Sequence, residues 1–596
     1  MSLKDELEKA FREAGKALPK VGESAHDSDG SKNKPTGTKS RPNASGRDKD
    51  QSGRADGPGK KRRRKGPRKS QDGAKLPGVR KTPKPPAPSL HSLMAAKSRN
   101  TEVASDEPEA RSEPYSLRIK PTARPYWKSR DCQGHSSEPG LLPVGKAKVR
   151  GTNSAGGVRE LVIGLDLGTS FAKVVVADRA LGRAMAVPFR DADGIDRYML
   201  PTRLVAGENG FSLSGSGDAY TNIKMDLLQN PDDAESRVRA TAFLTLVLIR
   251  VRSWIFQVSG GAYRSMDIVW SVGVGLPSRE QDEKAGVYEL IAEAAWYMSE
   301  EPEKEITAAR TKTALEKVSK SEEAQSEGQV CDVEIRIVPE IGAQVYGYVA
   351  SDRFNARDRN LFLMADVGAG TLDAAVFQVK RDRGRVNFCF YATTVEPNGV
   401  ANLHLSRLRW WEEVLDQLGD GAPNDLRSEI SSVRGEGRPT QRIPERIQEY
   451  VVGAEVGFND PNADPDANFY RNVDTQIRGR TLWQSWSDGH WSQDDLKGIP
   501  FYLCGGGSRL ELYGALRDSL REYRGYSWLN CEPKRLVVPE SLEAPGLGPD
   551  DYDRLSVAYG LSFANVGRVE RPEPGEKILM RAEGSWRDRY EEYTEK

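Results

Sequence analysis

Two stretches of the chain have the same layout: ELVIGLDLGTSFAKVVVAD at residues 160–178 and LFLMADVGAGTLDAAVFQV at residues 361–379. Each has an apolar run, an aspartate, a glycine two positions later, a short loop, a charged residue seven positions after the aspartate and a second apolar run. Because glycine supplies the backbone freedom of a tight turn, we expect each stretch to form a hairpin of two strands. A chain that repeats this hairpin is predicted to fold as two similar lobes around one nucleotide.

The turns of these hairpins are suited to bind phosphate. Successive N–H groups in a tight turn form a concave surface for phosphate oxygens, and threonine or serine hydroxyls add further donors. Glycine also lets the backbone approach a ligand closely. The residues that we expect to contact phosphate in the two turns are Gly168, Thr169, Ser170, Gly368, Gly370 and Thr371.

The aspartates of the hairpins indicate a cation. A carboxylate beside polyphosphate would repel it unless a cation lies between them. We therefore interpret Asp166 and Asp366 as ligands, through water, of a Mg²⁺ ion that the phosphates also hold. Asp373, the charged residue of the second hairpin, is expected to face the same site and to orient water or metal. An ordinary glycine-containing turn explains either hairpin alone, but it does not explain the matching offsets of the pair.

A third glycine-rich segment, IPFYLCGGGSRLELYGALRD, occupies residues 499–518. An apolar strand runs into a turn that is followed by a helix, and backbone without side chains at the start of a helix suits an adenosine ring and its α-phosphate. The chain contains no GxxxxGK[ST] motif, which argues against a P-loop enzyme. The predicted adenosine-binding residues are Gly505, Gly506, Gly507, Ser508 and Arg509.

Five motifs together resemble the nucleotide-binding domain of Hsp70-type ATPases, members of the actin/Hsp70/sugar-kinase superfamily. The resemblance covers residues 160–566 and implies a two-lobed fold that binds ATP and Mg²⁺ and hydrolyses ATP slowly. It is carried, in chain order, by DLGTSFAKV (166–174), VPEIGAQVYGYV (338–349), DVGAGTLDAAVF (366–377), YLCGGGSRL (502–510) and DRLSVAYGLSFA (553–564).

The resemblance also implies roles for three charged residues. Glu340 corresponds to a glutamate near the metal and the attacking water, and Asp373 to the aspartate of the second hairpin. Lys224, in YTNIKMDLL, corresponds to a lysine that contacts the γ-phosphate; the alternative is an ordinary exposed lysine.

The chain departs from the family pattern in three ways. Phe171 replaces a tyrosine after the first turn, and Arg554 stands where the family usually carries an aspartate. The sequence after the last motif is too short for the peptide-binding domain and lid of Hsp70 chaperones, so we do not expect client folding by the usual lid mechanism.

Strands and helices alternate over the part of the chain that carries these motifs, which predicts an α/β fold class. The expected strands are 161–166, 173–177, 267–274, 333–338, 361–366, 374–380, 386–393 and 500–504. The expected helices are 234–256, 281–298, 340–350, 402–418, 510–523 and 554–565, with an exposed helix or loop inserted at 302–328.

Composition divides the chain into four parts. Residues 1–157 are rich in Gly, Pro, Lys and Arg, so we expect a disordered arm with a short amphipathic helix at 2–19. Residues 158–352 are expected to form the first lobe, and residues 353–568 the second lobe with the adenosine motif. Residues 569–596 are expected to form a polar tail.

The net charge of +1 conceals a basic cluster in the arm. The segment from Lys60 to Lys69 carries eight basic side chains, which fits a solvated tail, nonspecific contact with nucleic acid or a localisation signal. No aromatic residues are interleaved with it, which argues against specific recognition of nucleic acid. No signal peptide or membrane-spanning run is present, so we expect a cytoplasmic protein without membrane contact.

Scattered cysteines, histidines and tryptophans are interpreted as structural. Cys389 and Cys504 lie in apolar runs and are expected to be buried free thiols. His404 and the tryptophans around Trp483 are expected to pack in the core of the second lobe, rather than to serve catalysis or a partner surface.

The expected function is ATP binding that controls the affinity for an unidentified protein partner, in a chaperone-like or regulatory role. Two alternatives remain open: an actin-like filament-forming ATPase, and a small-molecule kinase. A kinase would need a catalytic aspartate at a sugar pocket, and we find no motif for one.

Overall fold

The computed structural model describes residues 113–129, 140–143, 157–258, 263, 266–277, 281–323, 333–382, 385–419, 423–436, 442–522, 526–563 and 566–575. The predicted helix at 2–19 and the basic cluster at 60–69 lie outside the described residues. All described residues belong to one unit, residues 90–596.

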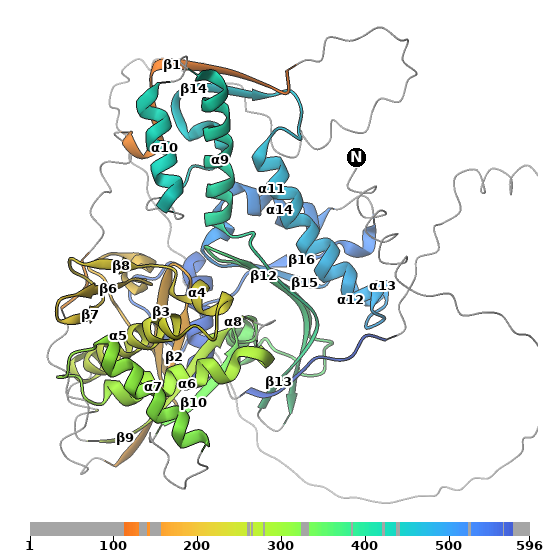
Figure 1. The fold of residues 1–596 in the computed structure, drawn as a ribbon. Helices are drawn as coiled ribbons and strands as arrows, with labels where there is room; N and C mark the ends of the chain where they lie inside the picture. Colours follow the sequence, from red (N-terminus) through yellow and green to blue (C-terminus); the bar gives the residue numbers. More distant parts are fainter. Residues whose placement is uncertain are drawn as a thin grey trace, which may run out of the picture. The chain divides into compact units, whose positions relative to one another are not determined.

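The first of two large mixed sheets is built around the first hairpin (Figure 1). Two strands parallel to the hairpin's first strand extend the sheet on one side, and the other side carries an antiparallel strand followed by a parallel edge strand. The order is β10 (Val333–Pro339), β9 (Asp267–Leu276), β2 (Val158–Leu167), β3 (Phe171–Asp178), β4 (Arg183–Ala186) and β17 (Leu542–Glu543), and the short β5 (Leu200–Pro201) also pairs with β3.

The second sheet repeats this order and these strand directions around the second hairpin. Its hairpin has the same register as the first, since Asp366 faces Asp373 across the ladder as Asp166 faces Lys173. The order is β16 (Glu532–Lys534), β15 (Pro500–Cys504), β11 (Leu361–Val367), β12 (Leu372–Asp382), β13 (Arg385–Glu396) and β18 (Val566–Glu570). All eight strands predicted from the apolar runs are therefore confirmed, and the fold class is mixed α/β.

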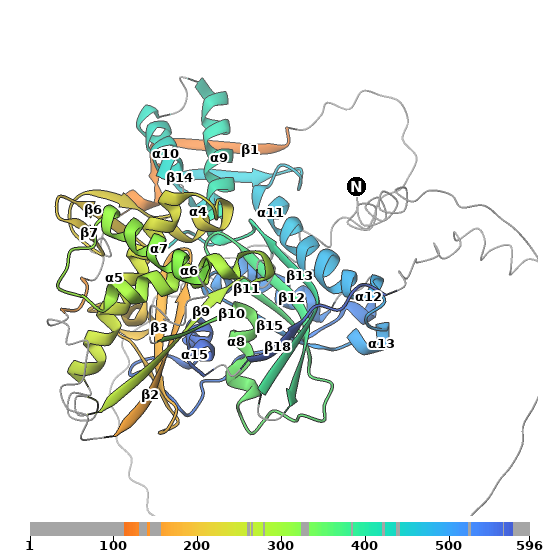
Figure 2. The same cartoon turned by 60° about the horizontal axis from the view of Figure 1, so that its bottom comes forward.

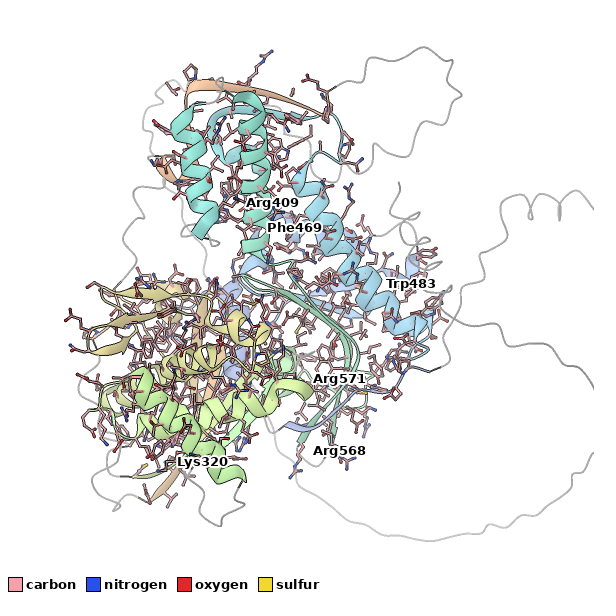
Figure 3. The ribbon with its side chains drawn as sticks, viewed as in Figure 1. Lys320, Arg409, Phe469, Trp483, Arg568 and Arg571 are labelled. Carbon is pink, nitrogen blue, oxygen red and sulfur yellow. The ribbon has the colours of Figure 1, made fainter. Side chains whose placement is uncertain are left out.

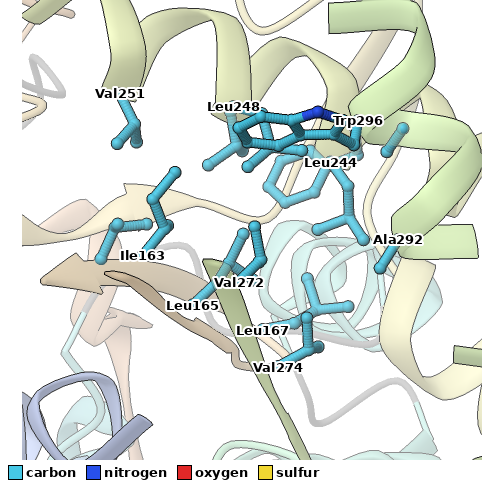
Figure 4. Close-up of a cluster of buried hydrophobic side chains, with 14 of the residues drawn as sticks. Ile163, Leu165, Leu167, Leu244, Leu248, Val251, Val272, Val274, Ala292 and Trp296 are labelled. Atoms are coloured by element: carbon cyan, nitrogen blue, oxygen red, sulfur yellow. The ribbon is translucent and has the colours of Figure 1, made fainter. Parts of the chain in front are cut away.

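Helices cover the outer face of the first sheet because alternate strand residues on that face are apolar. The helices are α5 (Ala234–Val258), α6 (Gln281–Ser299) and α7 (Ala308–Glu323), the last within the predicted insertion. Figure 4 shows how this layer packs. Its labelled side chains are Ile163, Leu165 and Leu167 of β2, Val272 and Val274 of β9, Leu244, Leu248 and Val251 of α5, and Ala292 and Trp296 of α6.

A second group of helices covers the outer face of the second sheet. One of them is continuous from Pro465 to Ser487 and widens into a π-helix over Thr475–Trp483, and Phe469 and Trp483 lie along it (Figure 3). The helices of this region are α9 (Val400–Leu418), α10 (Asn424–Glu436), α11 (Pro465–Asp474), α12 (Gln484–Ser487), α13 (Gln493–Leu496) and α14 (Glu511–Arg521).

The inner faces of the two sheets share one core with two helices, α8 (Glu340–Val349) and α15 (Ser556–Phe563) (Figure 2). These helices approach so closely that a Cβ atom at Gly560 would collide with the carbonyl oxygen of Ala343. Helix α15 contacts the first sheet in the same way: a Cβ at Gly164 would collide with the backbone of Ala558, and one at Gly273 would lie 2.5 Å from the carbonyl oxygen of Leu561. Glycine at these positions therefore brings backbone directly onto backbone.

The boundary of the predicted arm needs a correction, because residues 113–129 are ordered. Strand β1 (Tyr115–Pro125) pairs antiparallel with β14 (Val451–Phe458), beside α9 and α10 (Figure 1). Tyr115 packs edge-on against Trp410, with ring centroids 5.5 Å apart. A half-buried strand shows alternating apolar residues, and β1 has them at Tyr115, Leu117 and Ile119. This alternation is short and lies among Lys, Arg and Pro, so the average composition of the segment did not indicate a strand.

The polar tail also begins later than predicted, since β18 extends to Glu570. A small three-stranded sheet and a short helix follow the first hairpin and were not predicted: β6 (Leu204–Gly207), β7 (Gly210–Ser212), β8 (Asp218–Tyr220) and α4 (Ile223–Gln229). Within the ranges that the structure describes, no helix combines the length and apolarity needed to cross a bilayer.

Substituting Gly560 tests the close crossing of α8 and α15. Gly560→Ala should lower the free energy of unfolding by about 1–3 kcal/mol, because the new methyl group must displace the backbone of Ala343. Gly286→Ala is the matched control, since Gly286 lies in helix α6 with no atom within 4 Å of the added Cβ. This substitution should raise the free energy of unfolding by up to about 1 kcal/mol, because alanine is the better helix former. Equal effects in urea denaturation would contradict the close contact.

Candidate functional site

The turns of the two hairpins face each other. A Cβ atom at Gly370 in the second turn would lie 3.5 Å from Cγ2 of Thr169 in the first turn and 3.4 Å from Sδ of Met225. Met225 follows Lys224 in helix α4. The structure therefore brings three segments, predicted separately as site residues, into one place.

In the first turn, the aspartate is paired with the charged residue of its own hairpin. Asp166 is buried, and its Oδ2 lies 2.6 Å from Nζ of Lys173. Thr202 holds the turn from behind, since its hydroxyl donates to the carbonyl of Gly168 at 2.7 Å and its N–H donates to the carbonyl of Ser170 at 2.9 Å. These bonds fix the backbone of the turn in the shape that the hairpin requires.

In the second turn, the aspartate is held between helix α8 and the third glycine-rich turn. Gln344 donates from Nε2 to Oδ2 of Asp366 at 3.1 Å. Gly505 packs against the other oxygen, and a Cβ there would collide with Oδ1 of Asp366. Because Gly505 also has a φ of +85°, only glycine fits this position without strain. The predicted adenosine turn is thus in direct contact with a predicted metal ligand.

Lys224 and Glu340 form a buried ion pair at the same place. The Nζ of Lys224 lies 2.6 Å from Oε1 of Glu340, and the two side chains are 8% and 9% exposed. This burial rules out the alternative that Lys224 is an ordinary exposed lysine. Glu340 is the first residue of α8, directly after strand β10, so the end of a strand presents it to the site.

Crowding of buried carboxylates shifts the pKa values of the site. Burial, followed by the nearby charges of Glu340 and Asp166, raises the pKa of Asp366 to about 7. Burial and Glu340 raise the pKa of Asp373 to about 8. Burial also raises the pKa of Glu340, although Lys224 opposes this shift. These shifts favour the protonated form of Asp373 at neutral pH.

Lys224 shifts in the direction that keeps it charged. Burial lowers its pKa, but the carboxylates of Glu340 and Asp166 raise it by more, so that the net shift is upward. Lys224 is therefore the protonated partner of the ion pair, and it donates the short hydrogen bond to Oε1 of Glu340.

Two buried oxygen atoms of the site accept no hydrogen bond from the residues that the structure describes: Oδ1 of Asp373 and Oε1 of Gln344. Orphaned buried acceptors are costly, and a cation or water would satisfy them. Within the described ranges, no group of three or more His, Cys, Asp and Glu side chains is arranged to hold a metal alone. Mg²⁺ commonly binds through one or two carboxylates, water and substrate phosphates, so this donor set fits an ion delivered with a nucleotide.

The third turn differs from its predicted role in one respect. The Ser508 hydroxyl donates to the carbonyl of Gly505 at 2.7 Å. Arg509 is engaged by Asp551 and Asp553 at 3.0 and 2.9 Å, and it also donates to two backbone carbonyls. Arg509 therefore fixes the turn to the 3-10 helix Pro549–Arg554, whereas Ser508 closes the turn on itself, and Gly506 is the one exposed glycine of the three.

Sequence reasoning missed Gln344, Thr202 and Met225 as neighbours of the site. A signal for Gln344 existed: it follows Glu340 by four residues, and residues at this spacing share one face of a helix. Thr202 and Met225 carry no such signal, because only the tertiary fold brings them to the turns.

The residues interpreted as structural are buried, as predicted. His404 is fully buried, and its Nδ1 lies 2.8 Å from the Tyr450 hydroxyl. Trp483 is 4% exposed and packs among other aromatic rings. Cys389 and Cys504 are buried free thiols.

The chain matches no protein-family model, and no curated protein is detectably similar to it in sequence.

The protonation of Asp373 predicts a pH-dependent stability. An unfolded aspartate ionises near pH 4, whereas folded Asp373 keeps its proton until about pH 8, so unfolding releases a proton between these values and stability falls as pH rises. Asn cannot ionise, so the Asp373→Asn variant should not lose stability in this way. Its free energy of unfolding should exceed that of wild type by more than about 1 kcal/mol at pH 8, and by less at pH 5. Urea denaturation at both pH values measures this.

Asp495→Asn is the control for this experiment. The Ser492 side chain hydrogen-bonds the Asp495 carboxylate and holds its pKa below the usual range, so its contribution should be equal at pH 5 and pH 8. A constant difference between wild type and Asp373→Asn at the two pH values would contradict the assignment.

Proposed function

We propose that this chain is an Hsp70-like protein that binds ATP with Mg²⁺, hydrolyses it slowly and uses its nucleotide state to control the binding of a partner protein. The observation that carries the proposal is the contact between the two hairpin turns, with Lys224, Glu340 and Asp373 beside it. Two equivalent turns from two sheets, facing each other around buried carboxylates and a lysine, suit a polyphosphate and its cation.

The repeated sheet supports the finer proposal of a two-lobed, actin/Hsp70-like fold. Both sheets have the same strand order and directions, and their hairpins have the same register. Helices α8 and α15 lie in the core shared by the two sheets. Motions of one sheet against the other would therefore act through these two helices.

The chemistry assigned to the site uses the residues as the structure places them. Mg²⁺, when bound with the nucleotide, would neutralise phosphate charge, and Asp166 and Asp366 would hold it through water. Lys224 would contact the terminal phosphate through its positive charge, which the neighbouring Glu340 stabilises. The backbone N–H groups of Gly168–Ser170 and Gly368–Thr371 would bind the remaining phosphate oxygens.

Asp373 is the better general base of the two predicted catalytic carboxylates. Its Oδ1 has no hydrogen-bond partner among the described residues, whereas Glu340 is occupied by Lys224. Asp373 would accept a proton from water as the water oxygen attacks the γ-phosphorus and the bond to the β–γ bridging oxygen breaks.

Nucleotide binding would change the separation of the turns. A Cβ atom at Gly370 would lie 3.5 Å from Cγ2 of Thr169, and a polyphosphate between the two turns would need more space than this. A ligand that prefers the separated arrangement shifts the population toward it. The partner affinity would follow this shift, which is the coupling expected of a nucleotide-gated protein.

Substitutions at the site test the hydrolysis. Asp373→Asn should lower kcat for ATP hydrolysis by about 100-fold or more, while the Kd for Mg·ATP changes little, because the base acts in the reaction and not in binding. Asp166→Ala and Asp366→Ala should abolish Mg²⁺-dependent turnover while the far-UV circular dichroism stays unchanged. Glu334→Gln is the control, since Glu334 forms an exposed pair with Arg336. Full turnover in all three site variants would contradict the proposal.

Assembly separates this function from the alternative of an actin-like filament. The protein with Mg·ATP is expected to sediment at the velocity of a monomer over a range of concentrations. Pelleting that increases with protein concentration and requires ATP would favour the filament instead.

A further inference from the structure

Arg554 is an arginine of the site that no motif explains. It ends the 3-10 helix Pro549–Arg554, directly before α15, and its guanidinium lies against Gly506 in the third turn. The position of a Cβ on Gly506 is nearly equidistant from Nε, Nη2 and Cζ of Arg554, at 3.6, 3.6 and 3.7 Å. The guanidinium of Arg554 therefore lies beside Gly506, in contact range of the position that a side chain there would occupy.

The two arginines at this turn are in opposite situations. Arg509 is compensated by Asp551 and Asp553, at 3.0 and 2.9 Å. Arg554 is partly buried and forms no ion pair or side-chain hydrogen bond with the residues that the structure describes. Burial and the neighbouring Arg509 lower its pKa, and Asp196, Asp553 and Asp551 oppose this only through space.

The carboxylates around Arg554 are therefore not its partners. Asp551 and Asp553 are committed to Arg509, and Asp196, on the 3-10 helix Gly194–Tyr198 of the first half, is exposed to solvent. A partly buried guanidinium without a contact partner is unfavourable unless an anion completes its hydrogen bonds.

The position of Arg554 indicates which anion this is. Gly505 packs against Asp366, the predicted metal ligand, and the next residue, Gly506, packs against Arg554. Two adjacent residues of one turn therefore contact the predicted metal ligand and the guanidinium. We propose that Arg554 binds a phosphate of the nucleotide at the third turn. This inference rests on the proposed function and adds to it a phosphate contact that the glycine turn alone does not supply.

A guanidinium suits this role better than contact with the base. Its planar set of N–H donors matches two phosphate oxygens at once, and hydrogen bonds between charged groups are the strongest available to a side chain. The competing possibility is that Arg554 contacts the adenine base, in which case its contribution to binding would not depend on the phosphates. Ligands that share the adenosine group and differ in phosphate distinguish these two possibilities.

Isothermal titration of the full-length protein with Mg·ADP and with adenosine tests the inference. Arg554→Ala should raise the Kd for Mg·ADP by about 10- to 100-fold and leave the Kd for adenosine within about twofold. Arg554→Gln, which keeps the length of the side chain without its charge, should behave in the same way and serves if the alanine variant is unstable. Arg554→Lys should fall between wild type and alanine.

Arg535→Ala is the matched control, because Arg535 is an exposed arginine paired with Asp550 of the same 3-10 helix, and both Kd values should stay unchanged. Equal losses for Mg·ADP and adenosine in the Arg554 variants would overturn the phosphate contact, and so would no loss for either ligand. If the wild-type protein binds neither ligand, the proposed function fails together with this inference, whereas the first two outcomes leave that function standing.

Discussion

The arrangement of the site depends on one steric constraint: helices α8 and α15 meet backbone against backbone. The absence of a side chain at Gly560 allows α15 to touch Ala343, and the absence of side chains at Gly164 and Gly273 allows the same helix to lie directly on the first sheet. Helix α8 begins with Glu340, which reaches Lys224, and one turn later Gln344 reaches Asp366. Helix α8 therefore lies in the core shared by the two sheets and also contacts helix α4 through Glu340 and the second hairpin through Gln344.

This geometry places several carboxyl groups close together inside the protein, where the ionised form of each is unfavourable. Lys173 pairs with Asp166 and Lys224 with Glu340, whereas Asp366 and Asp373 form no ion pair among the residues that the structure describes, and burial raises the pKa of both. A bound cation would let these groups ionise and would lower the cost of burying them. Stability and ligand affinity are thus opposed at the same residues, as is common for functional sites.

The sequence was most informative where structure follows from local pattern. The hairpins, their register and the glycine turn after β15 could all be predicted, because period-2 apolar runs and turn glycines act over a few residues. Strand β1 could not, since its apolar face is complete only when β14 and Trp410 cover it. The site had the same limit: the aspartates were visible as motifs, but the pairing of Arg509 with Asp553 depends on segments that meet only in the folded chain.

Strand β1 pairs with β14, more than 300 positions along the chain, and the edge strand β17 of the first sheet is supplied by residues 542–543. Strand β1 therefore has no partner until β14 is synthesised, and the first sheet lacks its edge strand until residues 542–543 are synthesised. Closing such distant pairs is slow, and unpaired strand edges are prone to aggregate in the meantime. The topology therefore leaves β1 unpaired and the first sheet open at one edge on the growing chain for most of its synthesis.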